Sequence, residues 1–168
     1  FPNLKRLFLG GNYLDDASFL APLTHLEELG VEWNNLSDLS PLTALENLYY
    51  LNVGRNPAGN WSVLSSLPNL GSLEIHGMDI YDLAPISAFH LWRLIANDNH
   101  ISDTSPLLAL PGLGELALYN NQLVNLDPLL AVSSLWYVDV RENILDIYDP
   151  LSPAMQVIQQ LQSYANVD

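Results

Sequence analysis

One short pattern occurs seven times along this chain. LxxLxLxxN, or a close variant of it, returns every 22 residues, and the interval shortens to 21 residues once, between Leu70 and Leu91. Because a unit this short cannot bury its apolar residues alone, its copies must stack on one another. The sequence therefore predicts a single solenoid domain over residues 1–168. The seven repeats begin at Leu4, Leu26, Leu48, Leu70, Leu91, Leu113 and Leu135.

The apolar residues of each repeat alternate with other residue types. In the second copy, Leu26, Leu29 and Val31 occupy repeat positions 1, 4 and 6, and Asn34 occupies position 9. Positions 4 and 6 alternate with positions 3, 5 and 7, which is the period of a β-strand that is buried on one face. We expect the intervening side chains to form the accessible face of a parallel sheet.

A second segment follows the strand and carries the motif DLxPL. It occurs as Asp38–Leu42 and, with Ile in the last place, as Asp82–Ile86. With the leucine pattern, this motif resembles the leucine-rich repeat family, and in particular the 22-residue subclass shared by bacterial internalins and a eukaryotic phosphatase regulatory subunit. The resemblance implies an α/β solenoid: a right-handed coil with a concave parallel β-sheet and short 3₁₀ or helical turns on the convex side. It also implies protein binding as the usual function, without specifying a partner.

An asparagine ends the strand segment in six of the seven copies. Its amide both donates and accepts hydrogen bonds, so we expect a stack of these side chains to bond neighbouring turns of the coil. Met78 replaces the asparagine in the fourth copy, which is also the short one, and a local irregularity is expected there. The asparagines are Asn12, Asn34, Asn56, Asn99, Asn121 and Asn143.

Aspartate recurs at position 13, where the convex segment begins. A calcium ladder and helix capping both fit carboxylates at this position. Capping is the stronger interpretation, because Asp and Asn are preferred caps and the Gly-rich calcium nonapeptide is absent. We therefore predict caps for short turns that begin at Leu39, Leu83 and their equivalents, and no metal site. The residues are Asp16, Asp38, Asp82 and Asp103, with Asn60 and Asn125 in two other copies.

The two ends of the chain differ. Residues 1–4 match the junction between two repeats, so no polar terminal unit precedes the first repeat, and we expect the chain to be a fragment of a longer protein. At the other end, Ser152 and Pro153 provide a helix cap and a first helical residue. We predict a capping helix over about residues 153–165. Its apolar residues at helical spacing are Met155, Ile158, Leu161 and Ala165.

Charge and composition limit the partners. The net charge of −14 opposes binding to nucleic acid or anionic lipid, whose phosphates require a basic surface. A neutral to basic protein or peptide is favoured instead. No apolar run approaches the ~18 residues of a membrane span. The chain has no cysteine, which fits either redox compartment. Resemblance to internalins alone favours a secreted or bacterial cell-surface location.

The predicted strands carry all five basic residues and several large aromatic side chains at outward positions. Since Tyr, Trp and Arg are enriched at interface hot spots, we predict that this face binds a protein or peptide. Lateral ion pairs are expected between Arg6 and Glu28 and between Arg93 and Glu115. Trp92 and Trp136, at position 2, are assigned to packing at the rim. The predicted partner-binding residues are Arg6, Phe8, Trp33, Tyr50, Arg55, His76, Arg93, Ile95, Tyr119, Tyr137 and Arg141.

Catalysis finds no support in the sequence. The four histidines are scattered, and no nucleophile lies in a recognisable motif. Glu74 and His76 share one face, but nothing on an open sheet excludes water from them. We therefore predict no enzymatic activity and no cofactor. Two alternatives to a binding module remain: a passive spacer or scaffold in a larger surface protein, and a regulatory subunit of an enzyme.

Overall fold

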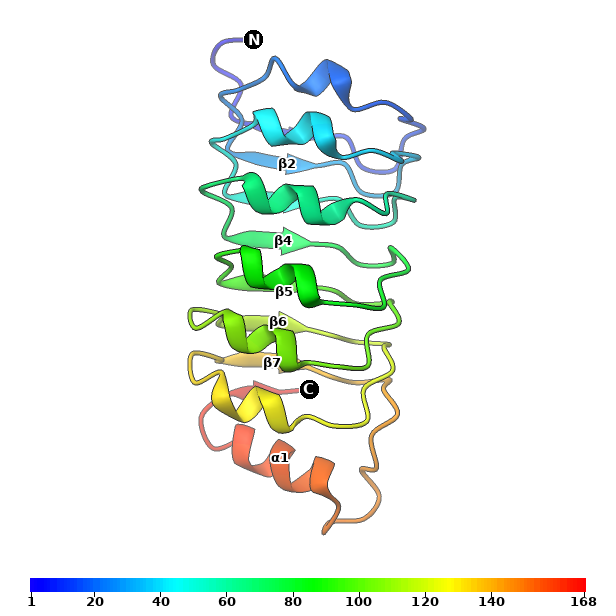
Figure 1. Ribbon diagram of the computed structural model, residues 1–168, viewed down its shortest axis with the longest axis vertical. Helices are drawn as coiled ribbons and strands as arrows, with labels where there is room; N and C mark the ends of the chain where they lie inside the picture. Colours follow the sequence, from blue (N-terminus) through cyan, green and yellow to red (C-terminus); the bar gives the residue numbers. More distant parts are fainter.

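The computed structural model describes residues 1–168 and confirms the predicted α/β solenoid (Figure 1). Each repeat contributes one strand of three residues to a single parallel sheet, whose strand order is the chain order. The strands are β1 (Arg6–Phe8), β2 (Glu28–Gly30), β3 (Tyr50–Asn52), β4 (Ser72–Glu74), β5 (Arg93–Ile95), β6 (Glu115–Ala117), β7 (Tyr137–Asp139) and β8 (Asn166–Val167). The helices are the 3₁₀ turns η1 (Ser18–Leu20), η2 (Ser40–Ala44), η3 (Trp61–Ser66), η4 (Ala84–Ala88), η5 (Ser105–Ala109) and η6 (Asp127–Ala131), and α1 (Pro153–Leu161).

The pairing of the strands follows the repeat. Leu29 pairs with Leu51, and Leu51 with Leu73, one repeat apart each time. Leu73 pairs in turn with Leu94, so the residue missing from the fourth repeat leaves the strand register intact. Every repeat position therefore forms a continuous column across the sheet.

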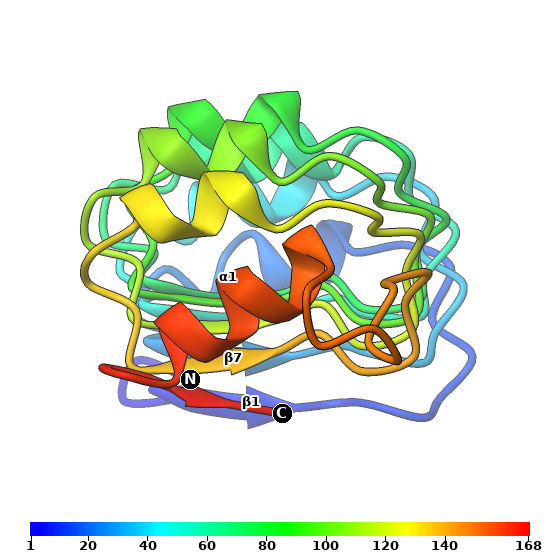
Figure 2. The same ribbon diagram turned by 90° about the horizontal axis from the view of Figure 1, so that it is seen from below.

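The core lies between the sheet and the layer of 3₁₀ turns (Figure 2). Leu26, Leu29 and Val31 of the second repeat are completely buried, as the alternation predicts. The buried side chains of successive repeats form one continuous apolar cluster. At the amino-terminal edge, Leu4 and Leu7 pack against this cluster but are only partly buried.

The asparagine column forms a hydrogen-bonded ladder. The Oδ1 atom of Asn56 accepts from the backbone N–H of Leu36 in the preceding repeat, at 2.9 Å. Its Nδ2 atom donates to the carbonyls of Val31, in the preceding repeat, and Val53, in its own. Asn34, Asn99, Asn121 and Asn143 join two coils in the same way, through backbone groups that would otherwise be buried without partners, whereas Asn12 bonds only within its own repeat.

The fourth repeat is irregular, as the loss of the asparagine predicts. Met78 cannot make the ladder bonds, and Oδ1 of Asn99 in the next repeat accepts from the backbone N–H groups of both Met78 and Ile80. Asp79 between them has a left-handed φ of 54°, which no other repeat shows at this position. The change is confined to this turn, because the strand register continues on both sides.

The four position-13 aspartates bond the start of the 3₁₀ turns that follow them, whereas Asn60 makes no such bond to η3 and accepts from the backbone N–H of Leu39 instead. Oδ1 of Asp38 accepts from the backbone N–H of Ser40 at 2.8 Å, which closes an Asx turn. The predicted start at Leu39 is one residue early, since η2 begins at Ser40 and Leu39 occupies the cap position. The bonds from Ser40 lower the pKa of the Asp38 carboxyl because they favour its charged form. Equivalent bonds are made by Asp16, Asp82 and Asp103.

Helix α1 covers the last repeat, and Oγ of Ser152 caps it by accepting from the backbone N–H of Met155. The helix ends at Leu161, four residues before the predicted boundary. Its buried face is formed by Ala154, Val157 and Leu161, which differs from the predicted set.

The chain leaves the helix early because it returns to the sheet. Strand β8 pairs with β7 in parallel, Tyr137 beside Asn166 and Val138 beside Val167. This short strand covers the open edge of β7, and the repeat pattern did not predict it.

Candidate functional site

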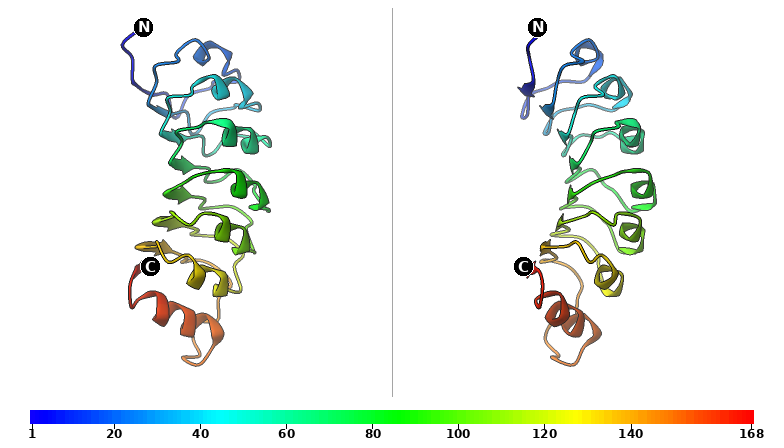
Figure 3. Two further views of the ribbon diagram at one scale, coloured as in Figure 1. Left: turned by 60° about the vertical axis from the view of Figure 1, so that its left-hand side comes forward. Right: turned by 90° about the vertical axis from the view of Figure 1, so that its left-hand side faces the viewer.

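The sheet lines the inner side of the curved coil, and the 3₁₀ turns lie on the outer side (Figure 3). The outward columns of the sheet therefore form a concave face. Three pairs of the predicted residues contact each other on this face, and one of them is Arg55 with Trp33, whose guanidinium lies 4.9 Å from the ring centre. Phe8 and Tyr50 pack with their ring centroids 6.4 Å apart, and the guanidinium of Arg141 lies 5.9 Å from the centre of the Tyr119 ring.

Arg93 is the centre of a polar cluster on the concave face. Its Nε atom donates to Glu115 at 2.9 Å, which confirms the predicted pair, and its Nη1 atom donates to Glu74 at 2.6 Å. The Tyr50 hydroxyl also donates to Glu74, at 3.1 Å. Burial opposes the positive charge of Arg93, but its bonds to the two carboxylates outweigh burial and raise its pKa.

Tyr50 remains a neutral hydrogen-bond donor in this cluster. Burial, and then the negative charge of Glu74, raise the pKa of its hydroxyl to about 12. The cluster therefore keeps one arrangement of donors and acceptors over the physiological pH range.

All five basic residues are held in ion pairs. The predicted pair of Arg6 with Glu28 is present, with Nε and Oε1 3.2 Å apart. Exposed pairs of this kind contribute little to stability. Their consequence is electrostatic: no cation on the concave face is without a carboxylate, and the face carries no basic patch. The remaining pairs are Lys5 with Glu27, Arg55 with Asp98, and Arg141 with Asp139.

A hollow of about 440 Å³ opens on the concave face beside the Arg93 cluster. Aromatic rings form its walls, and two carboxylates and one guanidinium lie among them. The Tyr49 hydroxyl donates to one of these carboxylates, that of Glu28. The lining residues are Phe8, Glu28, Tyr49, Tyr50, Ser72, Glu74, Trp92 and Arg93.

Trp92 and Trp136 lie at the start of their strands and pack at the rim, as predicted, but both remain half-exposed. They are 48% and 51% exposed, and Trp92 borders the hollow. Each indole lies over a glycine of the preceding strand segment. A Cβ atom on Gly71 would approach Cδ1 of Trp92 to 2.6 Å, and one on Gly114 would collide with Trp136. A glycine one repeat before each tryptophan is the sequence signal that could have identified this arrangement.

Many solved structures resemble this one, including the following three. Internalin C2 from Listeria monocytogenes superposes with a TM-score of 0.77 at 22% identity, covering 96% of this chain and 77% of that chain. A leucine-rich repeat protein from Leptospira interrogans gives 0.83 at 24% identity, over 99% and 43%. Internalin F from Listeria monocytogenes gives 0.65 at 25% identity, over 99% and 61%.

This chain is a leucine-rich repeat protein with an internalin-like fold. Neither a protein-family model nor a curated protein sequence matches it. The similarity of the leucine-rich repeat coil to these structures establishes the architecture, and the site must be argued from the chain's own residues.

Glu74 and His76 do not form an acid–base pair in this leucine-rich repeat protein. Glu74 is bonded to Arg93 and Tyr50 instead. The imidazole of His76 lies over Gly54, where an added Cβ atom would collide with the ring. Burial lowers the pKa of His76, while the charge of Glu74 acts in the opposite direction. The neutral ring therefore serves as a packed surface group.

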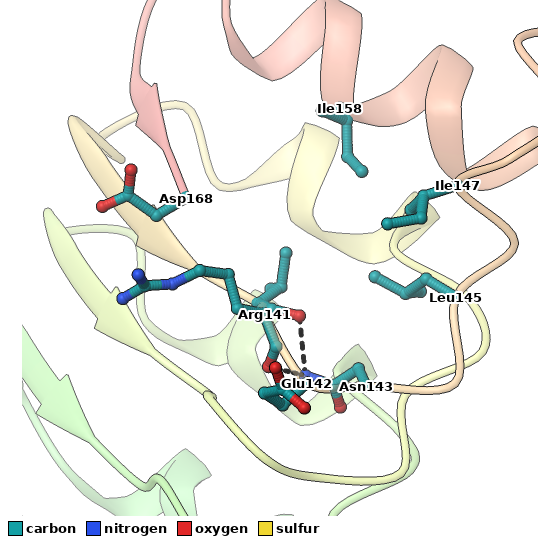
Figure 4. Close-up of a pocket in the computed structure, with 8 residues that line it drawn as sticks. Arg141, Glu142, Asn143, Leu145, Ile147, Ile158 and Asp168 are labelled. Atoms are coloured by element: carbon teal, nitrogen blue, oxygen red, sulfur yellow. Dashed lines mark hydrogen bonds between the residues drawn. The ribbon is translucent and has the colours of Figure 1, made fainter.

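A second, smaller hollow of about 130 Å³ lies at the carboxyl-terminal end (Figure 4). Ile158 projects from α1 towards Ile147 and Leu145 on the loop between β7 and α1. The Arg141 side chain extends away from these three residues, on the side of Asp168. This hollow belongs to the junction between the last repeat and its covering helix, and it lies outside the concave cluster.

The leucine-rich repeat domain has no helix of sufficient length and apolar character to cross a membrane. No cluster of three or more His, Cys, Asp or Glu residues is arranged to hold a metal ion.

Proposed function

We propose that this protein is an interaction module that binds a protein or peptide on the concave sheet. The observation that carries the proposal is the hollow beside Arg93, where aromatic walls and an ordered set of charges lie on a face that the apolar core does not require. Aromatic side chains and arginine dominate the energetics of protein interfaces. The partner-binding residues predicted from the sequence are proposed as its contact surface.

The backbone at repeat position 8 supports this proposal. The residue there has a left-handed φ in every repeat, a conformation that glycine adopts without strain. Gly11 and Gly77 occupy the position in two repeats, whereas Trp33 and Arg55 occupy it in two others. A bulky residue with positive φ costs roughly 1–2 kcal/mol. Glycine would satisfy the backbone at position 33. The Trp33 ring contacts the guanidinium of Arg55, 4.9 Å from the ring centre, yet it remains 58% exposed, and binding provides a reason for that exposure.

Charge defines the class of partner. The chain carries a net charge of −14, and each of its cations is paired with a carboxylate. A nucleic acid would meet no free cation, whereas a neutral or basic protein surface would meet an excess of carboxylates. We propose such a protein or peptide as the partner, and no catalytic activity. A bacterial, exported location is proposed from the Listeria and Leptospira origins of the similar structures.

The alternative of a passive spacer predicts a featureless concave face. The hollow and the clustered rings favour binding over that alternative. A regulatory subunit would use the same face for its enzyme, so it is a special case of the proposed function.

The test is selection of ligands followed by one substitution and one control. A phage-displayed peptide library is panned against the chain, and the selected peptides are measured by calorimetry. We expect Trp33→Gly to weaken binding at least about tenfold, which corresponds to ~1.4 kcal/mol. Its melting temperature should stay nearly unchanged, because relief of the strain offsets the ~0.5–1 kcal/mol entropic cost of glycine.

Tyr148→Ala is the matched control, because this tyrosine is 95% exposed and lies outside the concave face. It should change neither binding nor melting. The proposal is wrong if the selected peptides bind the two variants equally well. A large drop in the melting temperature of Trp33→Gly would show instead that the ring is structural.

A further inference from the structure

Three aromatic rings stand in a row at one edge of the concave face. Tyr49, Trp92 and Trp136 each precede the first residue of a strand, β3, β5 and β7 respectively. They are 41%, 48% and 51% exposed. Tyr49 and Trp92 line the same hollow, and Trp136 packs against Tyr137 on the sheet with centroids 6.3 Å apart. We call these three residues the aromatic ladder.

The ladder has regular gaps. Gly71 and Gly114 occupy the equivalent positions of the two intervening repeats. Each indole lies over the glycine before it, and the Tyr49 hydroxyl likewise reaches back to Glu28 in the preceding repeat. All three rings therefore lean in the same direction, and the spacing between them remains two strands.

The spacing selects one kind of peptide conformation. Strands lie ~4.8 Å apart, so the rings recur every ~9.6 Å along the coil. A polyproline II helix rises ~3.1 Å per residue with three residues per turn, and it repeats every ~9.3 Å. An extended strand presents the same face every ~6.7 Å, and an α-helix repeats at ~5.4 Å or, over two turns, ~10.8 Å. Only the polyproline II repeat matches the ladder to within a few tenths of an ångström per step.

Hydrogen-bonding capacity fits the same ligand. The indole N–H groups of Trp92 and Trp136 donate no hydrogen bond within the chain. Neighbouring residues make the hydrogen bonds there, from Arg93 to Glu115 and from Ser134 to the carbonyl of Leu113. A polyproline II helix has no internal hydrogen bonds, so its carbonyls are free to accept. Aromatic-lined grooves with such donors are a general means of recognising proline-rich segments.

We propose that the aromatic ladder binds a proline-rich, basic segment of a partner in the polyproline II conformation, lying along the coil and across the strands. Two steps of the ladder cover ~19 Å, which such a segment spans in about six residues. The basic character follows from the charges around the hollow between Tyr49 and Trp92. Glu28 pairs with Arg6, whereas Glu74 and Glu115 share the single cation of Arg93, which leaves an excess of one carboxylate. This inference rests on the proposed function and narrows its partner.

The experiment uses two synthetic peptides with the full chain. The first has proline at every third position and arginine at both ends, and the second replaces each proline with alanine. We expect the proline peptide to bind, with a change in tryptophan fluorescence, and the alanine peptide to bind at least about tenfold more weakly. Trp92→Ala and Trp136→Ala should each weaken the proline peptide by about tenfold, and Tyr148→Ala, outside the concave face, should leave it unchanged.

Gly71→Ala provides a test that removes no ring. Its Cβ atom would force the Trp92 indole out of place, so it should also weaken the proline peptide, whereas Gly112→Ala, with open space around its Cβ position, should not. Circular dichroism melts show whether each variant is folded.

Two results would overturn the proposed role of the aromatic ladder. One is that the folded wild-type chain does not bind the proline peptide, and the other is that wild type and Trp92→Ala bind it equally well. If peptides from the random library still depend on Trp33 in either case, the ladder inference fails while the proposed interaction function stands.

Discussion

Replacing Asn99 with alanine tests the asparagine ladder at its most heavily used member. Asn99 and Asn121 are 5% and 6% exposed, and each donates to three backbone carbonyls. They differ in what they accept. Asn121 accepts from the N–H of Ile101 alone, whereas Asn99 accepts from Met78 and Ile80. Asn121→Ala is therefore a control that matches Asn99→Ala in all but one hydrogen bond.

The magnitude follows from that one bond. A buried donor that loses its partner costs ~1–3 kcal/mol, so Asn99→Ala should lower the free energy of unfolding by that much more than Asn121→Ala does. For a chain of this length, 1 kcal/mol corresponds to about 2–4 °C in melting temperature, which predicts an additional drop of about 5 °C. Urea unfolding followed by circular dichroism measures the difference directly.

Equal losses in the two variants would refute this reasoning. They would mean that the backbone N–H of Met78 finds another acceptor once the Asn99 amide is removed, and that its bond to Asn99 adds nothing to stability. Asn12→Ala is a further reference, because Asn12 is exposed and bonds only to carbonyls of its own repeat. It should cost less than either.

Three other predictions concern packing and pH. Leu73→Ala, at a completely buried strand position, should cost ~2–5 kcal/mol of unfolding free energy, and Leu108→Ala, on the exposed convex side, well under ~1 kcal/mol, both measured by urea unfolding. Gly54→Ala should lower the free energy of unfolding because its Cβ atom displaces the His76 ring. In the His76→Ala background, where the ring is absent, Gly54→Ala should cost much less, and equal costs in the two backgrounds would contradict the collision. Burial lowers the pKa of His76 in the folded chain, so the imidazole of the unfolded chain becomes protonated at a higher pH than that of the folded chain. The stability contributed by the neutral ring is complete above about pH 6.5 and declines as the pH falls below it. His76→Asn should flatten this part of the stability curve, and an unchanged slope between pH 7 and pH 5 would disprove the assignment.

The repeat by itself determined the architecture and the neighbours within each column. A fixed interval places residues of one repeat position side by side on adjacent strands, so the inward leucines, the asparagine ladder and the pair of Arg93 with Glu115 were all predictable. The irregularity at Met78 was predictable for the same reason, because methionine cannot make the bonds of the amide that the period places there, and Asn99 instead accepts two backbone N–H groups at this turn.

Contacts that cross columns depended on the tertiary structure. Arg93 also reaches Glu74, which lies at a different repeat position on the preceding strand, because a long side chain follows the space that its neighbours leave. Trp92 and Trp136 lie over Gly71 and Gly114 because these residues have no side chains, and only the packed sheet shows this contact. Past the last repeat no period constrains the chain. The early end of α1 and the pairing of β8 with β7 were therefore decided by the exposed strand edge, whose free backbone groups the returning chain satisfies.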